Sequence, residues 1–348
     1  MPDQWMIYGA TGYTGALIAR EAVRQGLKPV LAGRGEAAAA IAGELNLESR
    51  IFSLKDADAV RKGLEGMRLV LLTAGPFSAT SAPVVQACLD QGCHYLDITG
   101  EIDVFEAVLA RDAEARDRNV ALCPGVGFDV IPTDCVAAVL ADALPDAHML
   151  RLGFESRSGF SPGTAKTSVE GFAGGGRIRR NGRIQRVPLG YKFDRIDFGA
   201  GPRLGVTIPW GDVSTAYYTT GIPNIETYIP ISPRNARRMM VANWIRPLAA
   251  LRPVQALMKK RAGKVRGPDE NKRSRTPAYV WGDIRNGKKE VRTARVVTAN
   301  GYDVTIHGSL SVVRHLLENH AAGALTPSRL MGPDFVSRLP GCGEIEIE

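Results

Sequence analysis

Short apolar runs alternate with helix-like segments over the first 125 residues of the chain. An apolar run at residues 5–8 is followed by a helical pattern over residues 17–23 and by a second apolar run at 29–32. Further apolar runs at 50–54, 69–73, 95–99 and 120–123 continue the same alternation. This order predicts an α/β domain with a parallel sheet of the Rossmann type.

The pattern changes after Pro145, where residues 150–232 become rich in Gly, Thr, Ser and Tyr. Strand-forming runs predict strands at 150–155, 216–220, 226–231, 278–285 and 293–300. The Asn300-Gly301 pair predicts a hairpin turn that leads into a strand at 302–308. A helix with one apolar face is predicted over residues 309–320. A second domain of different construction therefore follows the first.

The loop after the first apolar run reads GATGYTG. A pyrophosphate binds where a helix begins, because unpaired N–H groups and the helix dipole favour negative charge there. Glycines let the backbone approach the phosphates closely, and the two threonine hydroxyls can donate hydrogen bonds. The residues predicted to bind the dinucleotide at this loop are Gly9, Thr11, Gly12, Tyr13, Thr14 and Gly15.

The second apolar run ends at Gly33-Arg34, with no acidic residue before Glu36. An acid at this place accepts a hydrogen bond from the 2′-hydroxyl of NAD, whereas an arginine pairs with the 2′-phosphate of NADP. Arg34 therefore predicts NADP(H) as the cofactor.

Asp56 is predicted to face the adenine. The segment Ala74, Gly75, Pro76 and Phe77, at the carboxyl end of a central strand, is predicted to lie beside the ribose and nicotinamide.

Composition and charge exclude several classes of protein. With 45% hydrophobic and 23% charged residues, the chain has globular values, and no apolar stretch is long enough to span a bilayer. Its five scattered cysteines and its start, which lacks a signal peptide, predict a reduced cytoplasmic protein without a metal site. Residues 234–275 hold 13 basic and 2 acidic residues, whereas the rest of the chain holds 31 and 34. A nucleic-acid-binding surface is therefore not expected.

Five segments in order, GATGYTG, LAGR, TAGPF, YLDITGE and PGVGFDVIPTDC, resemble the saccharopine dehydrogenase-like family of NADP-dependent oxidoreductases. The last segment is also similar to the trans-acting enoyl reductases of that superfamily. The resemblance implies a Rossmann domain, an inserted α+β substrate domain on a mainly antiparallel sheet, and a final segment that returns to the first domain. We place these parts at residues 1–130, 131–308 and 309–348, and expect the middle part to contribute to a homodimer.

Two other enzyme classes with similar loops do not fit the sequence. Short-chain dehydrogenases need a lysine four residues after the catalytic tyrosine, and none of the nine tyrosines has one. Acyl-phosphate reductases need an activated cysteine, and no motif here activates one. The cysteines are expected to be buried and to behave as small apolar side chains.

A proton donor and a group that binds substrate are expected near the nicotinamide. The candidates are Glu101 and Asp129, which follow strands of the first domain, and Lys166 and Tyr217 from the second. Three of them have a simpler alternative: Glu101 or Asp129 would cap the helix that follows it, and Lys166 would be solvated. Likewise, the arginines of residues 177–186 are expected to lie on a solvated hairpin.

The chain is therefore predicted to be an NADP(H)-dependent oxidoreductase that acts on a small-molecule or lipid-like substrate. The bond reduced is a C=N bond or a C=C bond conjugated to a carbonyl, as in a trans-acting enoyl reductase. A non-catalytic NADP(H) sensor or membrane-surface protein is the alternative. The basic window 234–275, with Met and Leu between its arginines, predicts a lid, a peripheral membrane contact or plain packing.

Overall fold

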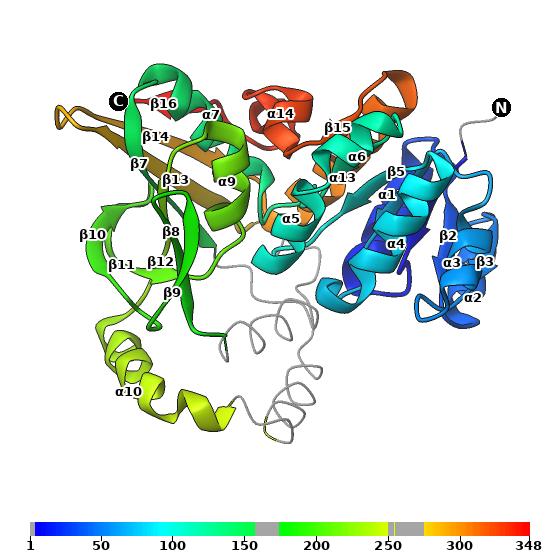
Figure 1. Ribbon diagram of the computed structural model, residues 1–348, viewed down its shortest axis with the longest axis horizontal. Helices are drawn as coiled ribbons and strands as arrows, with labels where there is room; N and C mark the ends of the chain where they lie inside the picture. The colour runs from blue at the N-terminus through cyan, green and yellow to red at the C-terminus, as the bar shows by residue number, and fades with distance from the viewer. Residues whose placement is uncertain (1–3, 157–173, 250–253, 255–274) are drawn as a thin grey trace. The chain divides into compact units, whose positions relative to one another are not determined.

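A computed structural model describes residues 4–156, 174–249, 254 and 275–348, and the chain divides into two units (Figure 1). The first unit comprises Met1–Asp129 and Tyr302–Met331, and the second comprises Val130–Gly301 and Gly332–Glu348. The second unit is thus inserted into the first. We predicted that all of 309–348 returns to the first domain, but Gly332–Glu348 belongs to the second unit.

Seven parallel strands form the sheet of the first unit, in the order β15-β6-β5-β4-β1-β2-β3. They are β1 (Trp5–Tyr8), β2 (Val30–Gly33), β3 (Ser49–Ile51), β4 (Leu69–Leu72), β5 (His94–Asp97), β6 (Ala121–Cys123) and β15 (Gly323–Ala324). Every residue of β1, β2, β4 and β5 is buried, as parallel strands covered on both faces require. The predicted Rossmann-type sheet is confirmed.

Helices connect these strands and cover the sheet (Figure 1). They are α1 (Tyr13–Arg24), α2 (Ala37–Glu44), α3 (Ala57–Leu64), α4 (Phe77–Gln91), α5 (Ile102–Leu109), α6 (Asp112–Asp117), α13 (Gly301–Glu318) and α14 (Pro327–Met331). The helix α13 replaces the hairpin and strand predicted at 300–308. Its residues Val304, Gly308, Val312 and Leu316 are buried at helical spacing, and Asn300 donates to the Thr276 hydroxyl at 2.8 Å. Packing of this face overrides the Asn-Gly turn signal.

The second unit is built on a mixed sheet with the order β10-β11-β12-β7-β13-β14-β16, to which the hairpin β8–β9 is joined through β12. The strands are β7 (Ala147–Ser156), β8 (Gly176–Arg180), β9 (Arg183–Val187), β10 (Phe193–Asp197), β11 (Pro202–Ile208), β12 (Asn224–Pro230), β13 (Ala278–Asn286), β14 (Val291–Thr298) and β16 (Glu346–Ile347). Only the β12–β7 pair is parallel among the pairs described. The predicted, mainly antiparallel second sheet is confirmed.

One face of this sheet carries α7 (Ile131–Ala143) and α9 (Asp212–Thr220), and α10 (Pro233–Ala249) and the short 3-10 helix η1 (Phe335–Arg338) complete the unit. At Gly282 on β13, a Cβ atom would lie 2.8 Å from Val136 and 3.0 Å from Leu140, so α7 packs directly on the strand. The strand predicted at 216–220 is wrong, because this segment lies in α9. Val213 and Ala216 are buried at helical spacing, and this packing outweighs the strand preference of Tyr and Thr.

The other face of the sheet is concave. The rings of Phe198, just after β10, and Trp281 on β13 have their centroids 6.1 Å apart, although three strands separate β10 from β13. With Ile196 and Tyr228 they form a buried apolar cluster, against which Tyr279 packs. Strong curling of the sheet therefore brings distant strands together.

Three general features of the described residues complete the fold. All five cysteines are described; none forms a disulfide, and Cys88, Cys93, Cys123 and Cys135 are buried as predicted. Within the described ranges, no cluster of three or more His, Cys, Asp or Glu side chains is suited to a metal ion. None of the helices that the structure describes is long and apolar enough to cross a bilayer.

Candidate functional site

The carboxyl edge of the first sheet brings the predicted cofactor residues together. From β1 the chain builds the sheet in one direction through β2 and β3, and in the other through β4, β5 and β6. Such a point of reversal leaves a crevice at the carboxyl ends of the strands, where ligands of doubly wound sheets bind. The loops that follow β1, β2 and β4 all open onto this edge.

The glycine loop lies against the end of β4 so closely that side chains have no room. At Gly9, which has φ +99°, a Cβ atom would lie 2.8 Å from the Ala74 nitrogen. At Gly15 a Cβ atom would lie 2.4 Å from the Gly9 oxygen and 2.6 Å from the Thr73 hydroxyl. The Thr73 hydroxyl donates to the Tyr8 carbonyl at 3.0 Å. The loop is thus held on two strands by backbone contacts that only glycine permits.

The helix α1 begins at this loop, and its first turn offers N–H groups to the solvent side. Gly12 is the N-cap, and no side chain caps α1 there. Thr11 and Gly12 are exposed, and Tyr13 and Thr14 are half-buried. An open helix N-terminus beside glycine is suited to a pyrophosphate, so the residues present fit a dinucleotide.

Arg34 lies in the exposed turn after β2, near the buried end of β1. Burial raises the pKa of the Tyr8 phenol, and the charge of Arg34 acts in the opposite direction, which places the guanidinium in that neighbourhood. The Tyr8 hydroxyl donates to the Phe52 carbonyl at 2.8 Å, and the two rings are 5.0 Å apart. Arg34 is therefore exposed to solvent at the end of β2, where a 2′-phosphate would lie.

Asp56 has a structural task at the start of α3. Its Oδ1 accepts from the Asp58 N–H at 3.0 Å and from the Ala59 N–H at 3.1 Å, and its side chain is exposed. The carboxylate thus caps α3, a role that the sequence analysis did not assign to it. The predicted contact with adenine stays a prediction.

Glu101 holds the loop after β4. Its Oε1 accepts from the Phe77 N–H and its Oε2 accepts from the Ser78 N–H, both at 2.8 Å. These N–H groups open α4, so the carboxylate caps the helix of the neighbouring strand and complements its dipole. The alternative prediction, that Glu101 caps the helix that follows it, is wrong, because no side chain caps α5. This contact from the loop after β5 fixes the end of the segment 74–77 at Phe77.

Asp97, which the sequence analysis did not single out, ties the ends of β5 and β6. It is fully buried and accepts from the Tyr95 hydroxyl at 2.6 Å, the Thr99 N–H at 3.0 Å and the Gly125 N–H at 2.8 Å. Burial raises its pKa to about 6, although these donors favour the charged form. The signal was an acidic residue that ends an apolar central strand.

Asp129 lies at the same edge, after β6. A Cβ atom on Gly100 would lie 2.8 Å from the Asp129 Oδ2, so the carboxyl group touches the turn that precedes Glu101. The side chain is half-buried, and burial raises its pKa to about 6. The N-cap residue of α7 is Val130, whose side chain forms no capping hydrogen bond, and the alternative that Asp129 caps this helix stays a prediction. The edge of the first sheet therefore carries a carboxyl group with a perturbed pKa.

The second-unit candidates are less well supported. Lys166 lies outside the described residues. The Tyr217 ring lies under the Arg179 guanidinium, 4.2 Å from its centre, and next to the turn of the β8–β9 hairpin. The hairpin itself is confirmed, with Arg180, Arg183 and Arg186 exposed. Arg179 is the exception to the solvated arginines expected there, because it is buried and donates to the Val213 and Gly182 carbonyls.

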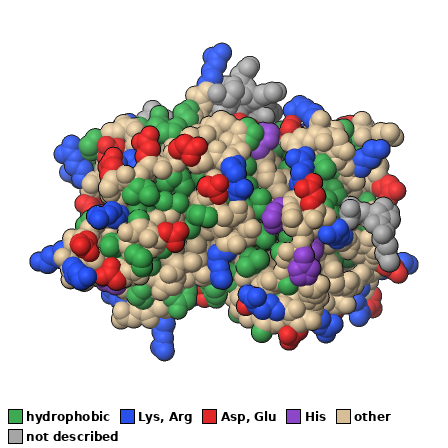
Figure 2. Space-filling model, turned by 90° about the horizontal axis from the view of Figure 1, so that it is seen from above, with side chains coloured by type: hydrophobic (Ala, Val, Ile, Leu, Met, Phe, Trp, Pro, Cys, Tyr) green, Lys and Arg blue, Asp and Glu red, His purple; other side chains and the backbone are tan. Residues whose placement is uncertain are grey.

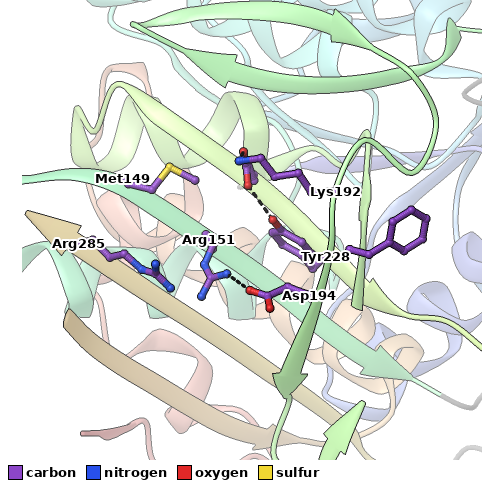
Figure 3. Close-up of a pocket in the computed structure, with 8 residues that line it drawn as sticks. Met149, Arg151, Lys192, Asp194, Tyr228 and Arg285 are labelled. Carbon is purple, nitrogen blue, oxygen red and sulfur yellow. Dashed lines mark hydrogen bonds and ion pairs between the residues drawn. The ribbon is translucent and has the colours of Figure 1, made fainter. Parts of the chain in front are cut away.

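The concave face of the second sheet contains a pocket of about 400 Å³ that the sequence did not predict (Figure 3). Arg151 donates to both oxygens of Asp283 and, at 2.6 Å, to Asp194. Figure 3 shows its guanidinium directed at Asp194. Glu226 accepts from Lys192 and, at 2.7 Å, from the Tyr228 hydroxyl. The charged groups at the base of this pocket are thus paired with one another.

Comparisons with known proteins agree with this geometry. The family described as the saccharopine dehydrogenase NADP binding domain matches residues 5–123. The chain is 27% identical over 219 residues to the human saccharopine dehydrogenase-like oxidoreductase. The match covers 54% of this chain and 51% of the relative. It is 31% identical over 138 residues to the trans-acting enoyl reductase of Mycobacterium bovis, which is 37% of this chain and 33% of the relative. The chain thus spans about half or less of these relatives' lengths.

The fold has a solved counterpart. The apo saccharopine dehydrogenase (L-Glu forming) from Saccharomyces cerevisiae superposes with a TM-score of 0.66 and 9% identity, over 99% of each chain. This likeness concerns the fold alone. Together, the glycine loop, the parallel sheet and the family match confirm the predicted resemblance and the cofactor class: residues 5–123 match the saccharopine dehydrogenase NADP binding domain.

Proposed function

We propose that this protein is an NADP(H)-dependent reductase of a polarised double bond, either C=N or a C=C bond conjugated to a carbonyl. The observation that carries the proposal is the carboxyl edge of the first sheet, where a glycine-built phosphate loop and the Asp129 carboxyl group both lie. Substrates of doubly wound oxidoreductases enter at this edge.

The cofactor would be held mainly by backbone. Gly9, Gly12 and Gly15, with the Thr11 and Thr14 hydroxyls, would surround the pyrophosphate, and the segment Ala74–Phe77 would border the ribose and nicotinamide. Arg34 would pair with the 2′-phosphate in a charge-assisted, forked contact. When bound, NADPH supplies a hydride to the substrate.

Asp129 is the proton donor in this proposal. With its pKa near 6, the carboxyl group keeps a proton in mildly acidic solution and can pass it to a substrate nitrogen or carbon. Glu101 is unsuited to that role, because both of its oxygens accept N–H groups of α4 and favour the anion. It acts as a positioning residue for the loop after β4. Tyr217 is the alternative proton donor, and Lys166 would bind a carboxylate or thioester carbonyl of the substrate.

Replacing Asp129 by Asn tests the proton donor. We expect kcat to fall about 100-fold or more, as general acid catalysis contributes at least that much, while the Kd for NADPH stays unchanged. The wild-type kcat should decrease as the pH rises through about 6, and the variant should lose this dependence. The matched control is Asp103→Asn, an exposed carboxyl on α5. An unchanged pH profile in Asp129→Asn would remove Asp129 from the mechanism.

The substrate class is a separate question. An enoyl reductase is the second candidate, supported by the 31% identity to a relative of that name. Following NADPH oxidation with enoyl thioesters in one panel and with amine–ketoacid pairs in another separates C=C from C=N reduction. Tight NADPH binding without turnover in both panels would instead favour an NADP(H) sensor.

A further inference from the structure

The solvent face of α10 combines arginine with exposed apolar side chains. Arg234, Arg237, Arg238 and Val241 are spaced i, i+3, i+4 and i+7, so they share one face of the helix, and all are exposed. No acidic residue occurs in Pro233–Ala249. In the part of the chain that the structure describes, no carboxylate pairs with these three arginines.

The opposite face of α10 fixes the orientation of the helix. Ala236 is only 6% exposed, and the Met239 sulfur packs on Gly190, where a Cβ atom would lie 3.2 Å away. Asn243 donates to the Leu189 carbonyl and accepts from the Leu189 N–H, both at 2.9 Å. The arginine face is thus held outward by packing and hydrogen bonds on the other side.

Two exposed apolar side chains accompany these arginines: Val241 lies among them, and Met240, about 100° further round the helix, lies beside Arg237 at the edge of the face. Val241 is 64% exposed and Met240 is 48% exposed, and they are the two most exposed large hydrophobic side chains in the described part of the chain. A solvated helix face gains nothing from such residues, whereas a bilayer interface accommodates apolar side chains below a ring of basic ones.

More positive charge lies in the segment to which α10 is bonded. Leu189, which is bonded to Asn243, lies two residues after β9, and Arg183 and Arg186 of that strand are exposed. In contrast, acidic and basic side chains are mixed over the face of the molecule seen in Figure 2. The arginines of α10 therefore offer a basic face to a negatively charged partner.

We propose that the α10 face, defined as Arg234, Arg237, Arg238, Met240 and Val241, binds the surface of a bilayer that contains anionic lipid. The arginines pair with headgroup phosphates and carboxylates, and Met240 and Val241 insert between the headgroups. A nucleic acid would satisfy the arginines but leave these two apolar side chains in water, and a protein partner would need both acidic and apolar side chains at matching positions. The proposal is independent of the reductase activity.

Co-sedimentation of the full chain with vesicles tests the proposal. We expect binding to phosphatidylcholine vesicles that contain phosphatidylserine, weaker binding at high salt, and little binding to phosphatidylcholine alone. Arg237→Glu/Arg238→Glu should weaken the partition at least about 20-fold, since each basic residue near the surface contributes about fivefold. Val241→Asp, which removes no arginine, should weaken it several-fold.

The matched control is Lys288→Glu/Lys289→Glu, in the exposed turn between β13 and β14, which changes the net charge equally. It should bind vesicles as the wild type does, and circular dichroism checks that every variant is folded. Equal losses in this control would show a non-specific charge effect and overturn the proposal. Binding to heparin or RNA but not to the anionic vesicles would overturn it as well.

Discussion

The carboxyl edge of the first sheet and the concave face of the second differ in what their polar groups bind to. At the edge, the groups that matter are backbone N–H groups around glycine, and they face outward from an uncapped helix. On the concave face, they are charged side chains that satisfy one another, as Arg151 does with Asp283 and Asp194. Polar groups that face outward, here called open groups, are available to a ligand. Polar groups that satisfy one another within the protein, here called closed groups, stabilise the fold.

The comparison predicts that changes to closed groups alter stability and that changes to open groups alter binding. The largest effect is expected for Arg151→Met. This change leaves the buried Asp283 without its forked partner, and the free energy of unfolding should drop by about 3–5 kcal/mol. Urea denaturation measures the loss, with the exposed Arg195→Met as the control. A loss below about 1 kcal/mol would contradict the role given to the network.

His94 is a closed group of the first unit and extends the comparison to pH. Its Nδ1 accepts from the Ala121 N–H at 2.9 Å, and burial, with Arg68 and His320 nearby, lowers its pKa from 6.5 to about 4. Between these pH values the His94 imidazole is protonated in the unfolded chain but stays neutral in the folded chain. The contribution of His94 to the free energy of unfolding should therefore fall by about 3 kcal/mol as the pH drops from 6.5 to 4.

The test compares the wild type with His94→Asn by urea denaturation across this pH range. The variant keeps an acceptor for Ala121 but cannot titrate, so the difference in unfolding free energy isolates His94. Asp97 and Asp129, whose raised pKa values act in the opposite direction, are present in both proteins and cancel. Parallel curves for the two proteins would refute the prediction.

Gly15→Ala addresses the open edge. A methyl group there would lie 2.4 Å from the Gly9 oxygen, so the loop must move away from β4. We expect the Kd for NADPH, measured by fluorescence titration, to rise about 100-fold, through the loss of charge-assisted contacts. Gly43→Ala, where the added atom meets nothing within 4 Å, is the matched control. Similar affinities in the two variants would mean that the loop does not hold the pyrophosphate.

The smallest effect is expected for Arg34→Ala. Loss of one exposed charged pair should raise the Kd for NADPH by roughly 10-fold, the low end of the range for hydrogen bonds to charged groups, and leave the Kd for NADH nearly unchanged. Arg20→Ala serves as the control, because Arg20 is also exposed but lies on α1. Equal losses for both cofactors would indicate that Arg34 does not select the phosphorylated form.

The sequence predicted what depends on neighbours along the chain. The strand–loop–helix–strand unit, with Gly9 to Gly15 and Arg34, is local, so spacing alone identifies it. Residues 216–220 and 302–308 were misassigned because burial against distant elements decided their conformation. Two other contacts depend on which strands become neighbours in the sheet. Glu101 caps α4, and Asp97 accepts hydrogen bonds from Thr99 and Gly125. No spacing along the chain encodes such pairings directly.

The edge strands β15 and β16 have a consequence for how the protein is made. β15 closes the first sheet beside β6, and β16 adds the last strand to the second sheet beside β14. Both come from residues 323–347, so a ribosome must translate more than 200 further residues after β6, which ends at Cys123, before either sheet is finished. A fragment cut after residue 123 would leave the β6 edge uncovered and prone to aggregation. An isolated nucleotide-binding domain should therefore be produced with residues 302–331 joined to it.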